Sequence, residues 1–107
     1  MNNIIVNNMV SDMPTGIRTP AITSIETALQ IFYTYPEIGN KEISQLFGKL
    51  SSATISKLKK AAKQRMVREN IYSYGTNTVN TKLAYLVWGI DIDDLEHRYK
   101  KLKELSL

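Results

Sequence analysis

The side chains best suited to chemistry are cations concentrated between residues 51 and 70. This segment holds six basic side chains against one acidic side chain, a net charge of +5. The basic residues are Lys57, Lys59, Lys60, Lys63, Arg65 and Arg68. Residues 1–50 sum to −1 and residues 71–107 to zero, so the segment accounts for the whole net charge of +4. Such a segment suits the phosphate backbone of a nucleic acid or an anionic membrane surface.

One long helix is expected to position these cations. Ser51 or Ser52 can cap its first turn, and the helical pattern continues to about Glu69. At about 100° per residue, the apolar side chains fall in one sector and the small or polar ones in the opposite sector. The inward sector holds Ile55, Leu58, Ala62 and Met66. The outward sector holds Ala53, Ser56, Lys57, Lys60, Gln64 and Arg68.

A shorter helix is expected immediately before it. Asn40 can cap this helix, and Gly48 can adopt the left-handed conformation that ends it. Ser44 is small where two crossing helices must approach each other. The apolar residues between the two helices are Ile43, Leu46, Phe47, Ile55 and Leu58. A short helix joined in this way to the start of the next helix matches the requirements of a helix-turn-helix.

Residues 40–60 resemble the helix-turn-helix of bacterial and phage DNA-binding regulators. The segment Thr54-Ile55-Ser56-Lys57 is similar to the threonine, aliphatic, serine, basic tetrad common early in their recognition helices. Two departures are visible: the family usually has alanine in place of Ser44, and the connection Gly48–Ser51 is longer than usual. The resemblance implies a three-helical DNA-binding core whose recognition helix enters the major groove.

The resemblance also assigns roles to side chains of the two helices. The first turns of a recognition helix reach base edges, whereas phosphate contacts position the protein without reading sequence. Base contacts are expected from Ser52, Ala53, Ser56, Lys57 and Lys60. Phosphate contacts are expected from Lys41, Lys49, Thr54, Lys63 and Gln64. Ser51, at the helix start, completes the candidate DNA-binding set.

The remaining chain is expected to flank this core. Residues 1–20 read as an irregular arm and residues 21–107 as a single helical domain, whose first helix runs from Thr23 to Pro36. Residues 70–78 are either a loop or a short winged hairpin. A C-terminal helical pair follows, one helix from about Thr78 to Trp88 and another from Asp91.

An apolar seam in the last helix predicts an interface. Ile92, Leu95, Tyr99 and Leu102 recur at spacings of three, four and three residues. Either this helix folds back onto the core, or Leu95, Tyr99 and Leu102 bury against a second chain. A homodimer is expected, because one recognition helix reads only a few base pairs and a two-fold protein doubles the site.

Composition excludes several other function classes. Without cysteine there is neither a disulfide nor a thiolate zinc site, and one histidine with no glycine-rich phosphate loop supports no catalytic constellation. We therefore expect no enzyme, no cofactor, no metal and no small-molecule ligand. Asp91, Asp93 and Asp94 suit a helix start rather than a metal. No apolar stretch is long enough for a membrane helix, so a cytoplasmic protein is expected.

These observations predict an all-α fold: a helix-turn-helix core with a C-terminal helical pair. The expected function is sequence-specific binding of double-stranded DNA, as a transcriptional regulator or as an accessory protein of a phage or mobile element. The alternative is a helical protein–protein adaptor or assembly protein whose basic face is merely solvated. A binder of anionic membranes ranks third, because the basic helix lacks the bulky apolar face that such helices need.

Overall fold

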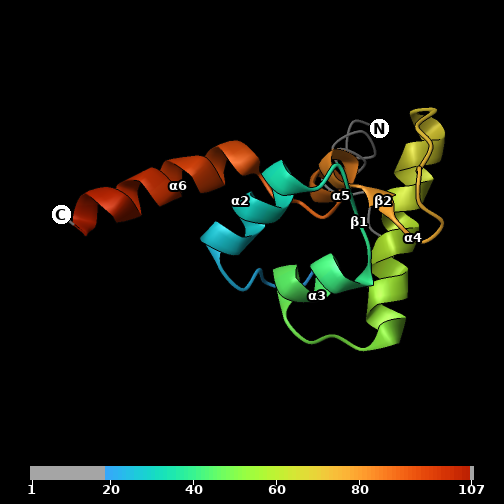
Figure 1. Ribbon diagram of the computed structural model, residues 1–107, viewed down its shortest axis with the longest axis horizontal. Helices are drawn as coiled ribbons and strands as arrows, with labels where there is room; N and C mark the ends of the chain where they lie inside the picture. Colours follow the sequence, from blue (N-terminus) through green and yellow to red (C-terminus); the bar gives the residue numbers. More distant parts are fainter. Residues whose placement is uncertain (1–18, 107) are drawn as a thin grey trace, which may run out of the picture.

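The computed structural model describes residues 19–106, which are mostly helical (Figure 1). The helices are α2 (Ile25–Thr34), α3 (Asn40–Phe47), α4 (Ser52–Arg68), α5 (Thr81–Val87) and α6 (Ile92–Leu105). Two short strands, β1 (Glu37–Ile38) and β2 (Val79–Asn80), pair antiparallel, with Glu37 opposite Asn80 and Ile38 opposite Val79. Most of the predicted N-terminal arm, including Arg18, lies outside the described residues.

The small sheet adds to the predicted helical fold and changes one helix boundary. The helix expected from Thr78 begins only at Thr81, because Val79 and Asn80 pair with β1 instead. The Thr81 hydroxyl donates to the Tyr35 carbonyl (2.6 Å), and the Thr81 amide donates to the Pro36 carbonyl (3.0 Å). These two hydrogen bonds extend the pairing of β1 with β2. The sheet therefore joins the end of α2 to the start of α5, far apart in the chain.

Side-chain caps define where the helices begin. Ser24 accepts from the amide of Thr27 (3.0 Å), and Asp91 accepts from the amide of Asp94 (3.2 Å). The expected cap of α3 is wrong: Asn40 is the first helical residue rather than the cap. The side chain at the start of α3 is instead the Glu42 carboxylate, which accepts from the backbone amide of Gly39 (2.8 Å).

Helix α5 crosses the centre of the core and bonds to two other helices. The Tyr85 hydroxyl donates to the Ala28 carbonyl in α2 (2.7 Å). The Trp88 indole donates to the Leu58 carbonyl in α4 (3.0 Å), and its ring lies 5.5 Å from that of Phe47 in α3. Both aromatic side chains are buried, so α5 fixes the positions of α2, α3 and α4 from inside.

Helix α6 starts on this body and then leaves it (Figure 1). Leu95, near its start, is buried in the common core, and α2 is the main neighbour of α6. The Tyr33 hydroxyl on α2 donates to Glu96 on α6. Tyr99 is half-buried and still borders α2, whereas Leu102 and Leu105 farther along the helix are exposed. Within the described residues, the predicted seam is therefore covered at Leu95, partly covered at Tyr99 and open at Leu102.

Candidate nucleic-acid interface

Helix α4 carries the cationic segment on a rigid element. Ser51 caps it by accepting from the amide of Thr54 (3.2 Å), and the helix ends at Arg68. The predicted inward sector is confirmed, since Ile55, Leu58, Ala62 and Met66 are all buried. Ala61 is buried as well, which the periodicity did not predict; both α5 and β2 pack against α4, and a small side chain allows a close approach.

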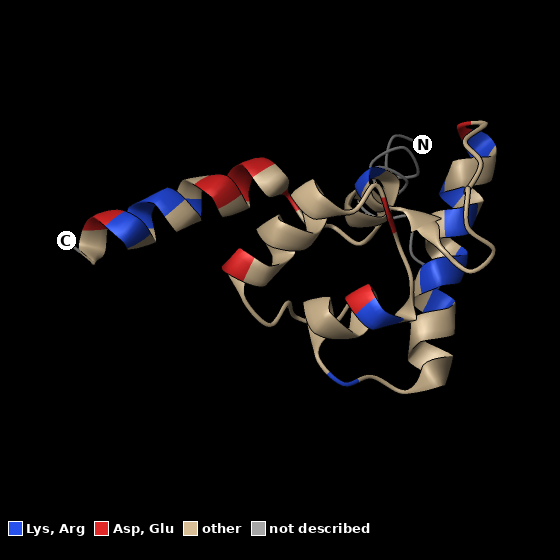
Figure 2. Cartoon of the chain, in the orientation of Figure 1, with Lys and Arg blue, Asp and Glu red and all other residues tan. Residues whose placement is uncertain are grey.

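The opposite face of α4 is exposed and carries no carboxylate from Ser52 to Arg68. Figure 2 shows the basic residues following one another along this helix, with an acidic residue only at its far end. Nine of the candidate DNA-binding residues lie on α4 or at its cap. Those that are exposed are Ser51, Ser52, Ala53, Ser56, Lys57, Lys60, Lys63 and Gln64, while Thr54 is half-buried.

Four of these side chains share a groove beside the helix. Ser56, Lys60, Lys63 and Gln64 line a hollow of about 400 Å³, together with Lys59, Val67 and, from the following loop, Asn77. Burial, and then the Lys63 ammonium, lower the pKa of Lys59. The groove thus gathers several ammonium groups into one open, concave surface, a good place for an anion.

Helix α3 meets α4 near the middle of that helix. The Lys59 ammonium donates to the side chain of Asn40 (2.9 Å), so the first turn of α3, which carries exposed Lys41, lies beside the middle of α4. Gly48, at φ +88°, ends α3 in a conformation that side chains rarely adopt. Lys49 follows it and is exposed in the connection between the two helices. Lys41 and Lys49 therefore flank the α4 face rather than lying on it.

The loop after α4 contains no strand between residues 70 and 78, so of the two alternatives the loop is correct. It is held instead by Glu37, whose carboxylate accepts from the amides of Tyr74 (2.7 Å) and Gly75 (3.1 Å) and from the Thr78 hydroxyl (2.6 Å). These bonds, above all the one from Thr78, lower the pKa of Glu37. Sequence reasoning missed Glu37, because its partners are about 40 residues away.

Two tyrosines project from this loop. Tyr72 is 82 % and Tyr74 100 % exposed, although both are large aromatic side chains. Gly75 is required beside them, since a Cβ there would lie 2.6 Å from the Thr78 hydroxyl oxygen. The Glu37 bonds therefore present exposed aromatic rings on an anchored loop next to the basic groove.

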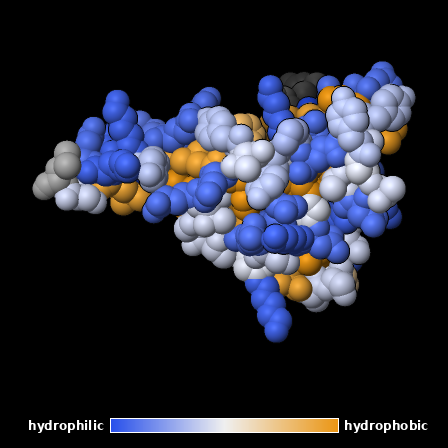
Figure 3. Space-filling view, in the orientation of Figure 1, coloured by the Kyte–Doolittle hydropathy of each residue, from blue (hydrophilic) through white to orange (hydrophobic). Residues whose placement is uncertain are grey.

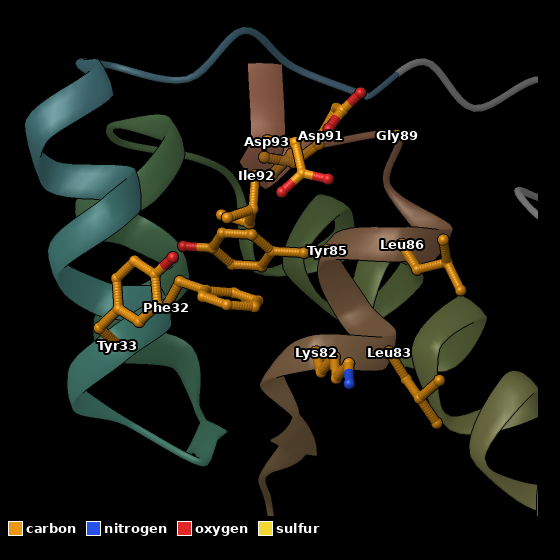
Figure 4. Close-up of a pocket in the computed structure, with 11 residues that line it drawn as sticks. Phe32, Tyr33, Lys82, Leu83, Tyr85, Leu86, Gly89, Asp91, Ile92 and Asp93 are labelled. Atoms are coloured by element: carbon orange, nitrogen blue, oxygen red, sulfur yellow. The ribbon is translucent and has the colours of Figure 1, made fainter. Parts of the chain in front are cut away.

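A second hollow, of about 830 Å³, lies between α2, α5 and the start of α6 (Figure 4). Its lining is mainly apolar and aromatic, including Phe32, Leu83 and Tyr85. Of its polar groups, the Tyr85 hydroxyl bonds to Ala28 and Asp91 caps α6, while Lys82 and Asp93 also line it. The mainly apolar walls leave few polar groups that could specify a ligand.

Other candidate chemistries find little support in the described part of the chain. Within residues 19–106, no three His, Cys, Asp or Glu side chains come together as a metal site. His97 is exposed on α6. None of the helices in this range combines the length and apolarity that crossing a bilayer requires.

Comparisons of the chain with models of protein families, with curated proteins and with solved structures found no match. The functional assignment therefore rests on the residues and on their geometry.

Proposed function

We propose that this protein binds double-stranded DNA through α4, with α3 and α4 acting as a helix-turn-helix. The observation that carries the proposal is the outward face of α4. It is exposed over its whole length, free of carboxylates, small at its start and cationic further along. A helix with small side chains can approach base edges closely, and the lysines that follow can reach phosphates or guanines.

The neighbouring elements support the same proposal. In Figure 1 α3 is drawn roughly horizontal and α4 roughly vertical, and a hydrogen bond joins Lys59 of α4 to Asn40 of α3. Two helices at a steep angle are what a helix-turn-helix needs for its second helix to lie in a groove. Lys41 and Lys49 flank α4 at positions suited to phosphates. The anchored loop with Tyr72 and Tyr74 lies on the other side of the basic groove, where it can touch the adjacent backbone.

The proposed role is sequence-specific, as a regulator or as an accessory protein of a phage or mobile element. Ser52, Ala53, Ser56, Lys57 and Lys60 would read bases. A homodimer would place two such faces on a two-fold site.

The test is the salt dependence of binding to a mixed-sequence duplex, measured by fluorescence anisotropy. On a mixed-sequence duplex, which lacks the target site, the base-reading Lys57 and Lys60 should contact phosphates instead. If these two and Lys41, Lys49 and Lys63 each neutralise one phosphate, the log–log slope is about −4.5. Affinity then falls about 500-fold between 50 and 200 mM salt. Binding that does not change over this range overturns the proposal and favours the adaptor alternative.

Two matched variants locate the interface. Replacing Lys60 and Lys63 with Gln should flatten the slope by about 1.8. Replacing Lys100 and Lys101 with Gln removes the same charge from α6 and should leave the slope unchanged. Equal effects of the two variants would show that binding depends on net charge rather than on α4. Selection of bound sequences from a random duplex library then tests whether the protein reads bases.

A further inference from the structure

Among the described residues, the outer part of α6 carries apolar side chains that stay largely exposed. Leu102 is 50 % and Leu105 83 % exposed, and Tyr99 is half-buried. Tyr99 and Leu102 continue the seam that begins with Leu95, which is buried in its own core. Figure 3 shows the hydrophobic surface running along α6 between charged side chains. The seam thus changes from an intrachain contact to an open apolar strip along one helix.

The charges of α6 are divided along its length. Its first half is acidic, with Asp93, Asp94 and Glu96, and its second half is mainly basic, with four cations (Arg98, Lys100, Lys101 and Lys103) against Glu104. Figure 2 shows acidic turns near the body, then basic turns, with one acidic residue near the free end. A helix with this pattern is complementary to itself when a second copy lies antiparallel to it.

We propose that α6 pairs antiparallel with α6 of a second copy, through Tyr99, Leu102, Glu96 and Lys103. This proposal specifies the interface of the homodimer in the proposed function, and it rests on that function for its biological role. In a heptad seam, Tyr99 and Leu102 occupy the two apolar positions, so an antiparallel pair stacks Tyr99 of each copy on Leu102 of the other. A two-fold axis makes both layers equivalent.

The same register brings opposite charges together. Glu96 and Lys103 are seven residues apart, so they occupy the same flank of the seam, one toward the body and one toward the free end. In the antiparallel pair Glu96 of each copy faces Lys103 of the other, twice per dimer. Both groups already lie beside the seam: Glu96 accepts from Tyr33, and the Lys103 ammonium lies 5.3 Å from the centre of the Tyr99 ring.

A groove at the base of α6 fits the end of the second helix. This hollow of about 640 Å³ lies between α2 and α6 and is lined in part by Leu29, Tyr33 and Tyr99. It also contains the carboxylates Glu26 and Glu96. In the proposed register the last turn of the second α6 arrives here, with apolar Leu105 and cationic Lys103, so shape, polarity and charge agree.

The test reverses one charge at a time and follows oligomeric state by sedimentation equilibrium without DNA. The unaltered protein should be a dimer at tens of micromolar. Glu96→Lys and Lys103→Glu should each raise the dimer dissociation constant by about 10-fold or more, because each homodimer then contains two like-charge contacts. An equimolar mixture of the two variants should dimerise again, since every Glu96–Lys103 position regains opposite charges.

Lys100→Glu is the matched control: it makes the same charge change on an exposed position of α6 away from the seam, and it should leave dimerisation intact. Circular dichroism of every variant checks that the helices are retained. A monomeric wild-type protein overturns the proposal, as do two variants that both remain dimers or a mixture that stays monomeric. A wild-type protein that dimerises as proposed but does not bind DNA would instead count against the proposed function alone.

Discussion

Removal of the Tyr85 hydroxyl should have a defined effect on stability. The side chain is 1 % exposed, and its oxygen donates to the Ala28 carbonyl at 2.7 Å, which ties α5 to α2. Tyr85→Phe keeps the ring and its contact with Phe32 and removes only this bond. The Ala28 carbonyl lies within α2 and keeps its place in the helical hydrogen-bond pattern.

The expected loss is that of one buried neutral hydrogen bond, about 1 kcal/mol. For a domain of this size it corresponds to a fall in Tm of about 4–8 °C. Urea unfolding followed by circular dichroism measures it as a lower midpoint with an unchanged slope. Tyr72→Phe is the control, because that side chain is 82 % exposed and should leave the midpoint unchanged.

Alkaline pH gives a second readout of the same bond. Burial raises the pKa of Tyr85 above its usual value of 10.0. Because the folded pKa is the higher one, the contribution to stability is complete below pH 10.0 and is lost as the pH rises through the folded pKa. Tyr85→Phe should therefore lose less stability than the wild type above pH 10.0. The reasoning is refuted if Tyr85→Phe has the same urea midpoint as the wild type. It is also refuted if Tyr85→Phe and the wild type lose stability equally as the pH rises above 10.0.

Three further predictions concern the proposed interface. Lys57→Ala should reduce the preference for one base pair by about 1–3 kcal/mol. Lys63→Ala should lower the affinity for all sequences alike and flatten the salt slope by about 0.9. Binding measured on matched and mismatched duplexes separates the two effects. Hydrogen bonds lower the pKa of Glu37, so its stabilisation of the loop is present above pH 4.5 and is lost as the pH falls through the folded pKa. The NMR shift of the Gly75 amide should therefore titrate below pH 4.5, and Glu37→Gln should abolish this titration. Gly48→Ala should cost about 1–3 kcal/mol in urea unfolding, because φ 88° with ψ −170° is a backbone region that essentially only glycine adopts.

Much of α4 could be predicted from sequence because local physics decides it. Its 17 residues hold apolar side chains at a consistent helical period, and a serine precedes them. The capping preference and the period therefore gave its start and its inward face correctly. Ala61 was missed because its burial depends on the elements packed against α4, which the helix's own pattern does not encode.

Long-range contacts account for the errors. Strands of two residues are too short to show alternation, so nothing local distinguished Val79 and Asn80 from a helix start. Likewise, Glu37 meets Tyr74, Gly75 and Thr78 only after the chain has folded. The candidate site divides the same way: the α4 face was predictable, while the loop that borders its groove was not.

The position of Trp88 gives the protein a built-in optical reporter. It is the single tryptophan of the chain and is 3 % exposed. Its indole bonds to a carbonyl in the middle of α4 and stacks edge-on against Phe47 at the end of α3. Its emission, shifted to short wavelength by burial, therefore depends on how these two helices sit against each other. Titration with DNA should leave the spectrum unchanged if the helices dock as a rigid pair, and any change in their crossing would be visible without a label.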